Sequence, residues 1–162
     1  MTPEQFAELL SAELERLEET EPRGEVTVET AAAIQSRRSI YELRAANGPE
    51  TRVWTSFEST AWTVVYEADP QFQVSCLHRF IYVKPVASMT AALQAADIVR
   101  NKTSTVGLAV SEHKVPELAL ELARWGASRV CPLGEMQNPP LSWRHDGRPP
   151  LGELVLWTDC EL

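Results

Sequence analysis

The segment from Arg79 to Leu133 constrains the fold most, because strand-like and helix-like patterns alternate along it. Ser88 and Pro116 are typical of helix starts, and Gly126 is typical of a helix C-terminus. Strands are predicted at 79–86, 105–110 and 128–133, and helices at 88–99 and 116–125. This order is characteristic of a parallel sheet with crossover helices. We therefore expect an α/β fold with a mostly parallel sheet.

Residues 1–47 have the pattern of two helices. Thr2 is a helix cap, Pro3 fits the first helical position, and Gln5 completes a capping box. The apolar face of the first helix contains Phe6, Leu9, Leu10, Leu14 and Leu17. The second helix is predicted at 28–46, with Ile34, Ile40 and Leu43 facing inward.

Two further strands are predicted before the alternating segment, at 52–57 and 61–67, because Val, Trp, Thr and Tyr are frequent there. The prediction is then a single domain of residues 1–162. Its parts are a helical region at 1–47, an α/β core at 52–133, and a loop with a C-terminal strand at 134–162.

The net charge of −8 lies entirely in the first part of the chain. Residues 1–70 hold 14 acidic and 6 basic side chains, and residues 71–162 hold 9 of each. An acidic surface argues against nucleic acid as a partner, because phosphate contacts need clustered Lys and Arg. Acidic glutamates on a helix face are most simply a solvated surface.

Membrane insertion and secretion are not expected. No apolar run approaches the ~20 residues that a transmembrane helix needs, and the acidic N-terminal helix does not resemble a signal peptide. The three cysteines, Cys76, Cys131 and Cys160, are odd in number and widely spaced. This predicts reduced thiols in the cytoplasm, with no disulfide framework and no metal site.

Several short motifs, in their order and spacing, resemble the acyl-CoA reductase family, the fatty acyl-CoA reductases of the bacterial bioluminescence type. The later motifs are Gly126–Arg129, Pro132–Met136, Trp143–Gly147 and Leu154–Asp159. The earlier motifs are Val53–Ser56, Trp62–Glu67, Ser75–Arg79, Val83–Val86 and Thr105–Ala109. The resemblance implies a fold like the catalytic lobe of aldehyde dehydrogenases.

The resemblance also implies a cysteine nucleophile and NADPH, which together convert an acyl thioester to an aldehyde. In the family this cysteine lies just upstream of a helix similar to 6–17, and the Rossmann-like domain lies earlier still. No Gly-rich dinucleotide loop occurs in this sequence. We therefore expect the C-terminal segment of an NADPH-dependent fatty acyl-CoA reductase, inactive alone and not binding NADPH alone. Its expected partners are a long-chain acyl-CoA or acyl thioester, the missing N-terminal part or a complementing chain, and a second copy in a homo-oligomer.

Cys76 is the weak candidate for a replacement nucleophile, because His78 is two residues away. Nothing in the sequence holds His78 in place, and the family has this stretch at a strand entry. We therefore expect a half-buried thiol at Cys76.

The substrate-loop candidates are Trp143, Arg144, His145, Asp146 and Arg148. By resemblance this loop lines the substrate entrance, where His145 is a candidate proton donor or acceptor. Arg144 or Arg148 is a candidate contact for a coenzyme A phosphate. In the alternative, Asp146 stabilises a turn and Arg148 pairs with a glutamate.

Two other functions remain open from the sequence. One is a stand-alone, non-catalytic α/β module that binds or complements a partner chain. The other is a small thiol enzyme that uses Cys76.

Overall fold

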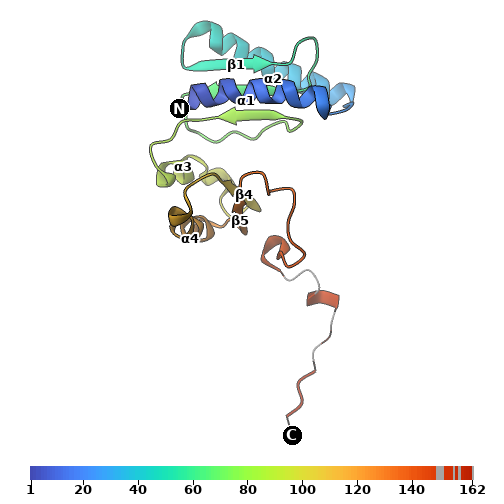
Figure 1. The fold of residues 1–162 in the computed structure, drawn as a ribbon, viewed down its shortest axis with the longest axis vertical. Helices are drawn as coiled ribbons and strands as arrows, with labels where there is room; N and C mark the ends of the chain where they lie inside the picture. The colour runs from blue at the N-terminus through green and yellow to red at the C-terminus, as the bar shows by residue number, and fades with distance from the viewer. Residues whose placement is uncertain (149–151, 155, 157, 162) are drawn as a thin grey trace. The chain divides into compact units, whose positions relative to one another are not determined.

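The computed structural model describes residues 1–148, 152–154, 156 and 158–161. The chain divides into two compact units, an N-terminal unit (Met1–Ala95) and a C-terminal unit (Ala96–Leu162) (Figure 1). Among the described residues, no helix combines the length and apolar character needed to cross a bilayer. Each unit is compact by itself. That the two form a single domain over residues 1–162 stays a prediction.

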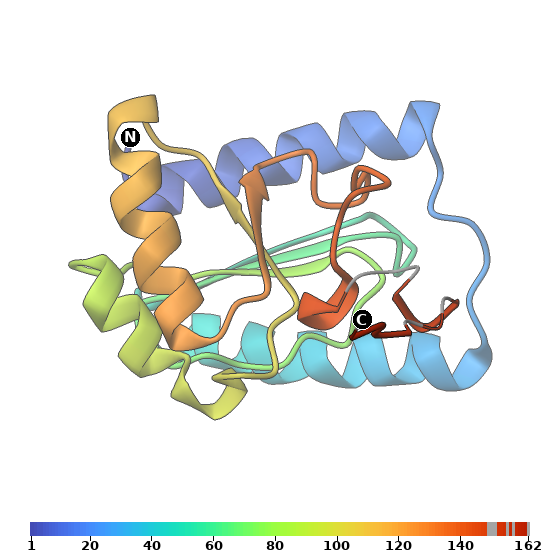
Figure 2. The same ribbon diagram turned by 90° about the horizontal axis from the view of Figure 1, so that it is seen from below.

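The N-terminal unit is a three-stranded sheet between two long helices. Its elements are α1 (Pro3–Thr20), α2 (Val28–Asn47), β1 (Thr51–Thr55), β2 (Thr63–Glu67), β3 (Phe80–Val83) and α3 (Met89–Ala95). The strand order is β1-β2-β3, with β1 antiparallel and β3 parallel to β2. Figure 2 shows α1 and α2 on opposite sides of these strands. The two predicted strands before residue 79 therefore do pair with the third.

The helix starts follow the local sequence. The hydroxyl of Thr2 accepts a hydrogen bond from the Gln5 backbone N–H at 3.2 Å, and the Gln5 side chain accepts from the Thr2 N–H at 2.9 Å. This confirms the predicted capping box. Thr27 caps α2 in the same way by accepting from the Thr30 N–H. The second helix, predicted at 28–46, is confirmed to within one residue.

The core of the N-terminal unit is built around β2, because this strand is covered on both faces. Val64 packs with Ala7 and Leu14 of α1. Val65, its neighbour in sequence, packs with Ile34 and Tyr41 of α2. Both valines are fully buried, since successive side chains of a strand point to opposite faces.

Some of the residues predicted to face inward on α1 and α2 are exposed instead. Ile34 is buried, but Ile40 and Leu43 are 53% and 67% exposed. On α1, Leu14 is buried whereas Phe6 and Leu9 are 40% and 58% exposed. The buried residues of α2 are Ile34, which was predicted, together with Arg38 and Tyr41, which were not.

Arg38 faces inward because its guanidinium organises the turn between β1 and β2. It donates to Thr63 Oγ1 (2.8 Å), to the Ser59 carbonyl (2.6 Å), and to Ser56 Oγ (3.0 Å) and the Trp62 carbonyl (2.6 Å). The residue is only 4% exposed, and its burial lowers the pKa of the guanidinium. A buried cation is tolerated here because polar acceptors surround it.

The C-terminal unit contains a smaller, parallel sheet. Its elements are the 3₁₀ helices η1 (Asp97–Val99), η2 (Glu112–Lys114), η3 (His145–Gly147) and η4 (Gly152–Leu154), the strands β4 (Thr105–Leu108) and β5 (Arg129–Pro132), and the helix α4 (Val115–Trp125). β4 and β5 pair in parallel. Gly126 ends α4 at a φ of 111°, as the sequence predicted.

The α/β prediction is confirmed, but the predicted single sheet from residue 79 to 133 is wrong. β3 belongs to the mixed sheet with β1 and β2, whereas β4 and β5 form a separate sheet. Phe80 and Val83 are buried by their place beside β2, and local sequence does not determine this long-range pairing. A mostly parallel arrangement and a likeness to the aldehyde dehydrogenase lobe stay predictions.

The C-terminal strand predicted at Leu154–Asp159 is not formed by the described residues. Leu154 lies in η4, and residues 156, 158 and 159 are in no strand. Val155 and Trp157 lie outside the described residues.

Candidate functional site

Three side chains of the C-terminal unit form an aromatic and cationic stack at the predicted substrate loop. The rings of Trp143 and His145 meet edge to face, with their centroids 4.9 Å apart. The guanidinium of Arg129 lies 5.4 Å from the Trp143 ring centroid. Arg144 and Arg148 are exposed, and the side chain of Asp146 lies outside the described residues. The structure thus brings Trp143 and His145 together.

Arg129 also fixes the start of this loop. It opens β5 and donates to the backbone carbonyls of Met136 and Glu135, both at 2.8 Å. The same side chain therefore connects the sheet, the turn at 135–136 and the indole of Trp143. Such a cation over an indole typically contributes about 0.5–1 kcal/mol at a partly exposed site.

A hollow of about 420 Å³ adjoins the stack. It is lined by Ser104, Thr105, Met136, Gln137, Pro139 and Trp143. Its size lies within the usual range of small-molecule sites. The Trp143 indole nitrogen is buried and has no hydrogen-bond partner in the described part of the chain. The hollow therefore has a mixed lining of apolar and hydrogen-bonding side chains.

Gly107 allows the loop to approach the sheet. A Cβ atom at this position would lie 2.7 Å from the sulfur of Met136 and 3.2 Å from a methyl carbon of Leu133. A larger residue would require the side chains of Met136 and Leu133 to move. Arg129, Met136 and Gln137 were not predicted as site residues, although Arg129 and Met136 lie in the family motifs. A glycine inside a strand, such as Gly107, is a signal of close approach.

Cys76, the weak nucleophile candidate, lies against the apolar cluster under α2. Its partners there include Ile34, Tyr41 and Phe80. Burial raises the pKa of the Cys76 thiol, even though the cations of Arg37 and Arg38 act in the opposite direction. A raised pKa lowers the thiolate fraction at neutral pH, and the thiolate is the nucleophile. These surroundings favour the interpretation of Cys76 as a half-buried structural thiol over that of a nucleophile.

The turn after Cys76 has an unusual backbone. Leu77, His78 and Arg79 have φ angles of 65°, 53° and 61°. Three consecutive non-glycine residues in the left-handed region cost roughly 1–2 kcal/mol each. Ser75 holds the turn, because its hydroxyl donates to the Phe80 carbonyl (2.5 Å) and accepts from the Leu77 N–H (3.0 Å).

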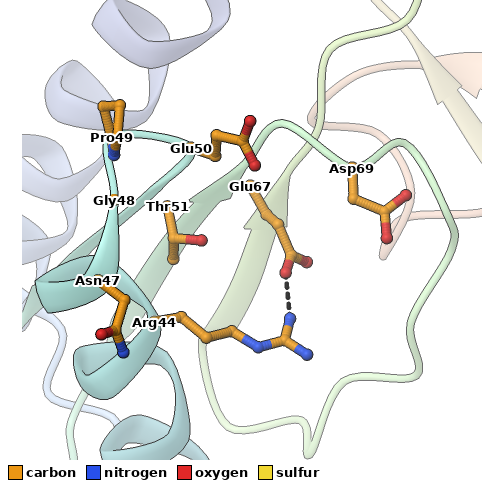
Figure 3. A pocket seen from close by; sticks show the side chains of 8 residues that line it. All are labelled: Arg44, Asn47, Gly48, Pro49, Glu50, Thr51, Glu67 and Asp69. Atoms are coloured by element: carbon orange, nitrogen blue, oxygen red, sulfur yellow. Dashed lines mark hydrogen bonds and ion pairs between the residues drawn. The ribbon is translucent and has the colours of Figure 1, made fainter.

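A second hollow, of about 560 Å³, lies at the end of α2 in the N-terminal unit. It is lined by Arg44, Asn47, Gly48, Pro49, Glu50, Thr51, Glu67 and Asp69. Figure 3 shows Arg44 reaching from α2 toward Glu67 on β2. Glu67 is 5% exposed and also accepts from Lys84 at 2.7 Å. Both carboxylate oxygens are thus engaged, which makes Glu67 a structural ion pair rather than a free base.

Cofactor binding by the described residues depends on their metal ligands and their helix N-termini. No group of three potential ligands is found among them. A diphosphate usually binds free N–H groups at a helix N-terminus that follows a strand. After β3, Ser88 Oγ already accepts the Ala91 N–H at 3.1 Å. After β4, η2 precedes α4, which has Pro116 in its first turn. Each of these helix starts therefore has at least one N–H group fewer for a diphosphate.

Comparison with known proteins gives one family. The model of the acyl-CoA reductase (LuxC) family matches residues 1–157. No curated protein matches the chain.

Proposed function

Because this chain belongs to the acyl-CoA reductase (LuxC) family, we propose that it is the C-terminal segment of an NADPH-dependent fatty acyl-CoA reductase. The complete enzyme cleaves the thioester C–S bond of a long-chain acyl-CoA and releases a fatty aldehyde. NADPH supplies the hydride in that enzyme. The observation that carries this proposal is the family match over nearly the whole chain.

The nucleophilic cysteine and the NADPH pocket belong, in this proposal, to polypeptide other than these 162 residues. Two observations support it. The Cys76 thiol is packed in an apolar cluster with a raised pKa. After β3 the Ser88 hydroxyl already caps the first turn of α3, and after β4 the first turn of α4 contains Pro116, which has no N–H. The isolated chain then produces no aldehyde. The unpaired thiols support a cytoplasmic location.

The hollow beside Trp143 receives part of the acyl-CoA. Its lining offers an indole and a thioether for apolar groups. The Gln137 amide and the hydroxyls of Ser104 and Thr105 suit the amide groups of the substrate's pantetheine arm. His145, held against Trp143, is the candidate proton donor or acceptor beside this hollow. The exposed Arg144 and Arg148 contact the phosphates.

The test is calorimetric titration of the chain with a long-chain acyl-CoA, alongside an aldehyde assay with NADPH. We expect binding that weakens about tenfold in Trp143→Ala, since one buried aromatic contact is worth about 1–2 kcal/mol. Trp54→Ala, in the other unit, is the control and should leave the affinity unchanged. No measurable binding would contradict the substrate assignment. Aldehyde formation by the chain alone would contradict the segment assignment.

A further inference from the structure

The loop after β5 lies over one face of the small parallel sheet. Side chains of a strand alternate between the two faces, so Thr105 and Gly107 of β4 share a face. Residues paired across neighbouring strands also share a face, and Thr105 pairs with Arg129 of β5. Arg129 binds the loop through the backbone carbonyls of Glu135 and Met136. The loop therefore covers the face that carries Thr105, Gly107 and Arg129.

Met136 is the loop residue that lies directly over Gly107. A Cβ atom at Gly107 would lie 2.7 Å from the Met136 sulfur and 3.2 Å from its Cγ atom. Non-bonded carbon atoms normally approach to about 3.5–4.0 Å, so Met136 occupies the space that a side chain at this position would fill. Leu133 borders the same space, with its Cδ1 atom 3.2 Å from that Cβ position. The face of β4 is thus blocked at Gly107.

The hollow beside Trp143 is consequently bounded along β4 by Met136. Ser104 and Thr105 line the hollow at the beginning of the strand. Met136 lines it where the next residue on the same face, Gly107, is covered. Ser104 and Thr105 offer hydroxyl groups, whereas Met136 offers a thioether and a methyl group. The lining therefore changes from polar to apolar in the direction of β4.

We propose that Met136 is a specificity-determining residue, the end wall that limits how many methylene groups of the acyl chain enter the hollow. This inference rests on the proposed function, in which the hollow receives part of an acyl-CoA. The pantetheine amides bind beside the Ser104 and Thr105 hydroxyls, and the first methylene groups extend along β4 to the Met136 thioether. Each methylene group buried in the hollow raises the affinity about fourfold. A methylene group beyond Met136 adds nothing.

Calorimetric titration of the full chain with acyl-CoAs of increasing chain length tests the end wall. The affinity should rise with chain length and level off at the length that reaches Met136. Met136→Ala should move this limit to longer chains by about two methylene groups, because the vacated space adjoins the hollow. The longest chains should then gain about 15-fold relative to the shortest. An affinity that never levels off in the unmodified chain would overturn the proposal.

Met136→Trp should move the limit in the opposite direction, to shorter chains, because a larger side chain fills the hollow from the same side. Opposite shifts in the two variants distinguish an end wall from a loop that is merely destabilised. A destabilised loop weakens the binding of all acyl-CoAs alike. Such a uniform loss, with the limiting length unchanged, would overturn the proposal.

Met89→Ala is the matched control, because Met89 is a half-buried methionine at the start of α3, outside the hollow. It should leave the limiting chain length unchanged. Met136 is 37% exposed on a loop, so Met136→Ala should unfold at nearly the same temperature as the unmodified chain. An equal shift of the limit in Met89→Ala would contradict the role of Met136.

Gly107→Ala, added to Met136→Ala, tests where the end wall lies. The new methyl group enters the space that the Met136 sulfur occupied. The limit should therefore return toward shorter chains by about one methylene group. A limit that stays where Met136→Ala placed it would show that the wall does not lie over Gly107, and would overturn the proposal.

The possible outcomes separate the end wall from the proposed function. Binding with the same limiting length in the unmodified chain and in both Met136 variants would overturn the end wall, and the substrate hollow would stand. No binding of any acyl-CoA to the unmodified chain would overturn both.

Discussion

The N-terminal unit buries most of its sheet, whereas the C-terminal unit leaves its sheet half-covered. In the N-terminal unit, α1 and α2 cover both faces of β2. Among the described residues of the C-terminal unit, the buried apolar ones lie in or just after α4, namely Leu122, Trp125 and Ala127. The residues of β4 and β5 are all half-buried or exposed. The candidate substrate hollow adjoins this half-covered sheet.

This difference suggests that the N-terminal unit is mainly structural and that the candidate site belongs to the C-terminal unit. Parallel strands are normally buried on both faces, so a half-covered parallel sheet is a surface that another molecule can cover. Substitutions in the N-terminal unit should therefore act mainly on stability. Substitutions around the hollow should act mainly on binding. The predictions below test this division, beginning with the largest effect.

Arg38→Met should reduce the free energy of unfolding by about 3 kcal/mol. The change removes the Arg38 donor from the buried Thr63 hydroxyl and from three acceptors that each keep a second partner. It also leaves space where the buried guanidinium stood, and both effects are costly. Urea denaturation measures the effect. Arg37→Met, at the half-buried neighbouring position, is the control and should cost less than about 1 kcal/mol. Equal losses in the two variants would contradict the role of Arg38.

Truncating one valine in each sheet compares the two units directly. Val65→Ala should cost about 2 kcal/mol, because Val65 is completely buried in β2. Val106→Ala should cost less than about 1 kcal/mol, because Val106 in β4 is only half-buried. Denaturant titration measures both. A larger loss for Val106→Ala would show that the C-terminal sheet is better covered than the structure indicates.

Alkaline pH should destabilise the N-terminal unit. Burial raises the pKa of both Tyr82 and Cys76 in the folded chain. Unfolding returns these groups to their ordinary pKa values, so above about pH 9 the unfolded chain has released protons that the folded chain retains. The free energy of unfolding then falls as pH rises, by up to about 1.4 kcal/mol per pH unit and titrating group.

Tyr82→Phe should remove the tyrosine part of this alkaline loss. The Tyr82 hydroxyl is buried and lacks a well-formed hydrogen bond among the described residues, and the nearby Tyr41 hydroxyl raises its pKa further. The substitution should therefore cost little at neutral pH. Denaturation curves between about pH 8 and pH 11 make the comparison. An unchanged pH dependence in Tyr82→Phe would contradict this assignment.

His78→Gly should stabilise the chain by about 0.5–1 kcal/mol. His78 has a φ of 53°, a conformation that glycine adopts without the penalty of a Cβ atom. The thermal midpoint measures the gain. His113→Gly, in the 3₁₀ helix η2, is the matched control. It should not stabilise, because glycine there only adds freedom to the unfolded chain.

The elements with local signals could be predicted from the sequence. Thr2 and Gln5 cap α1, and Gly126 ends α4, because capping depends on residues within one turn. The inward face of α2 could not be predicted. Arg38 is buried only because a turn some twenty residues away supplies its acceptors. Hydrophobicity alone therefore assigned Ile40 and Leu43 to the core.

The candidate site was predictable only where its contacts are local in sequence. Trp143 and His145 are close in sequence, and their contact is local. Arg129 and Met136 join them through the pairing of β5 with β4 and the close approach at Gly107. Such contacts depend on the tertiary structure, so the residue pattern of the loop did not reveal them.

Amide hydrogen exchange with and without a long-chain acyl-CoA tests the central claim most directly, that this family member receives its substrate beside Trp143. We predict slower exchange around residues 104–107 and 135–145, with α1, α2 and the sheet of the N-terminal unit unchanged. Protection confined to the N-terminal unit, or no protection at a concentration where calorimetry shows binding, would contradict the account.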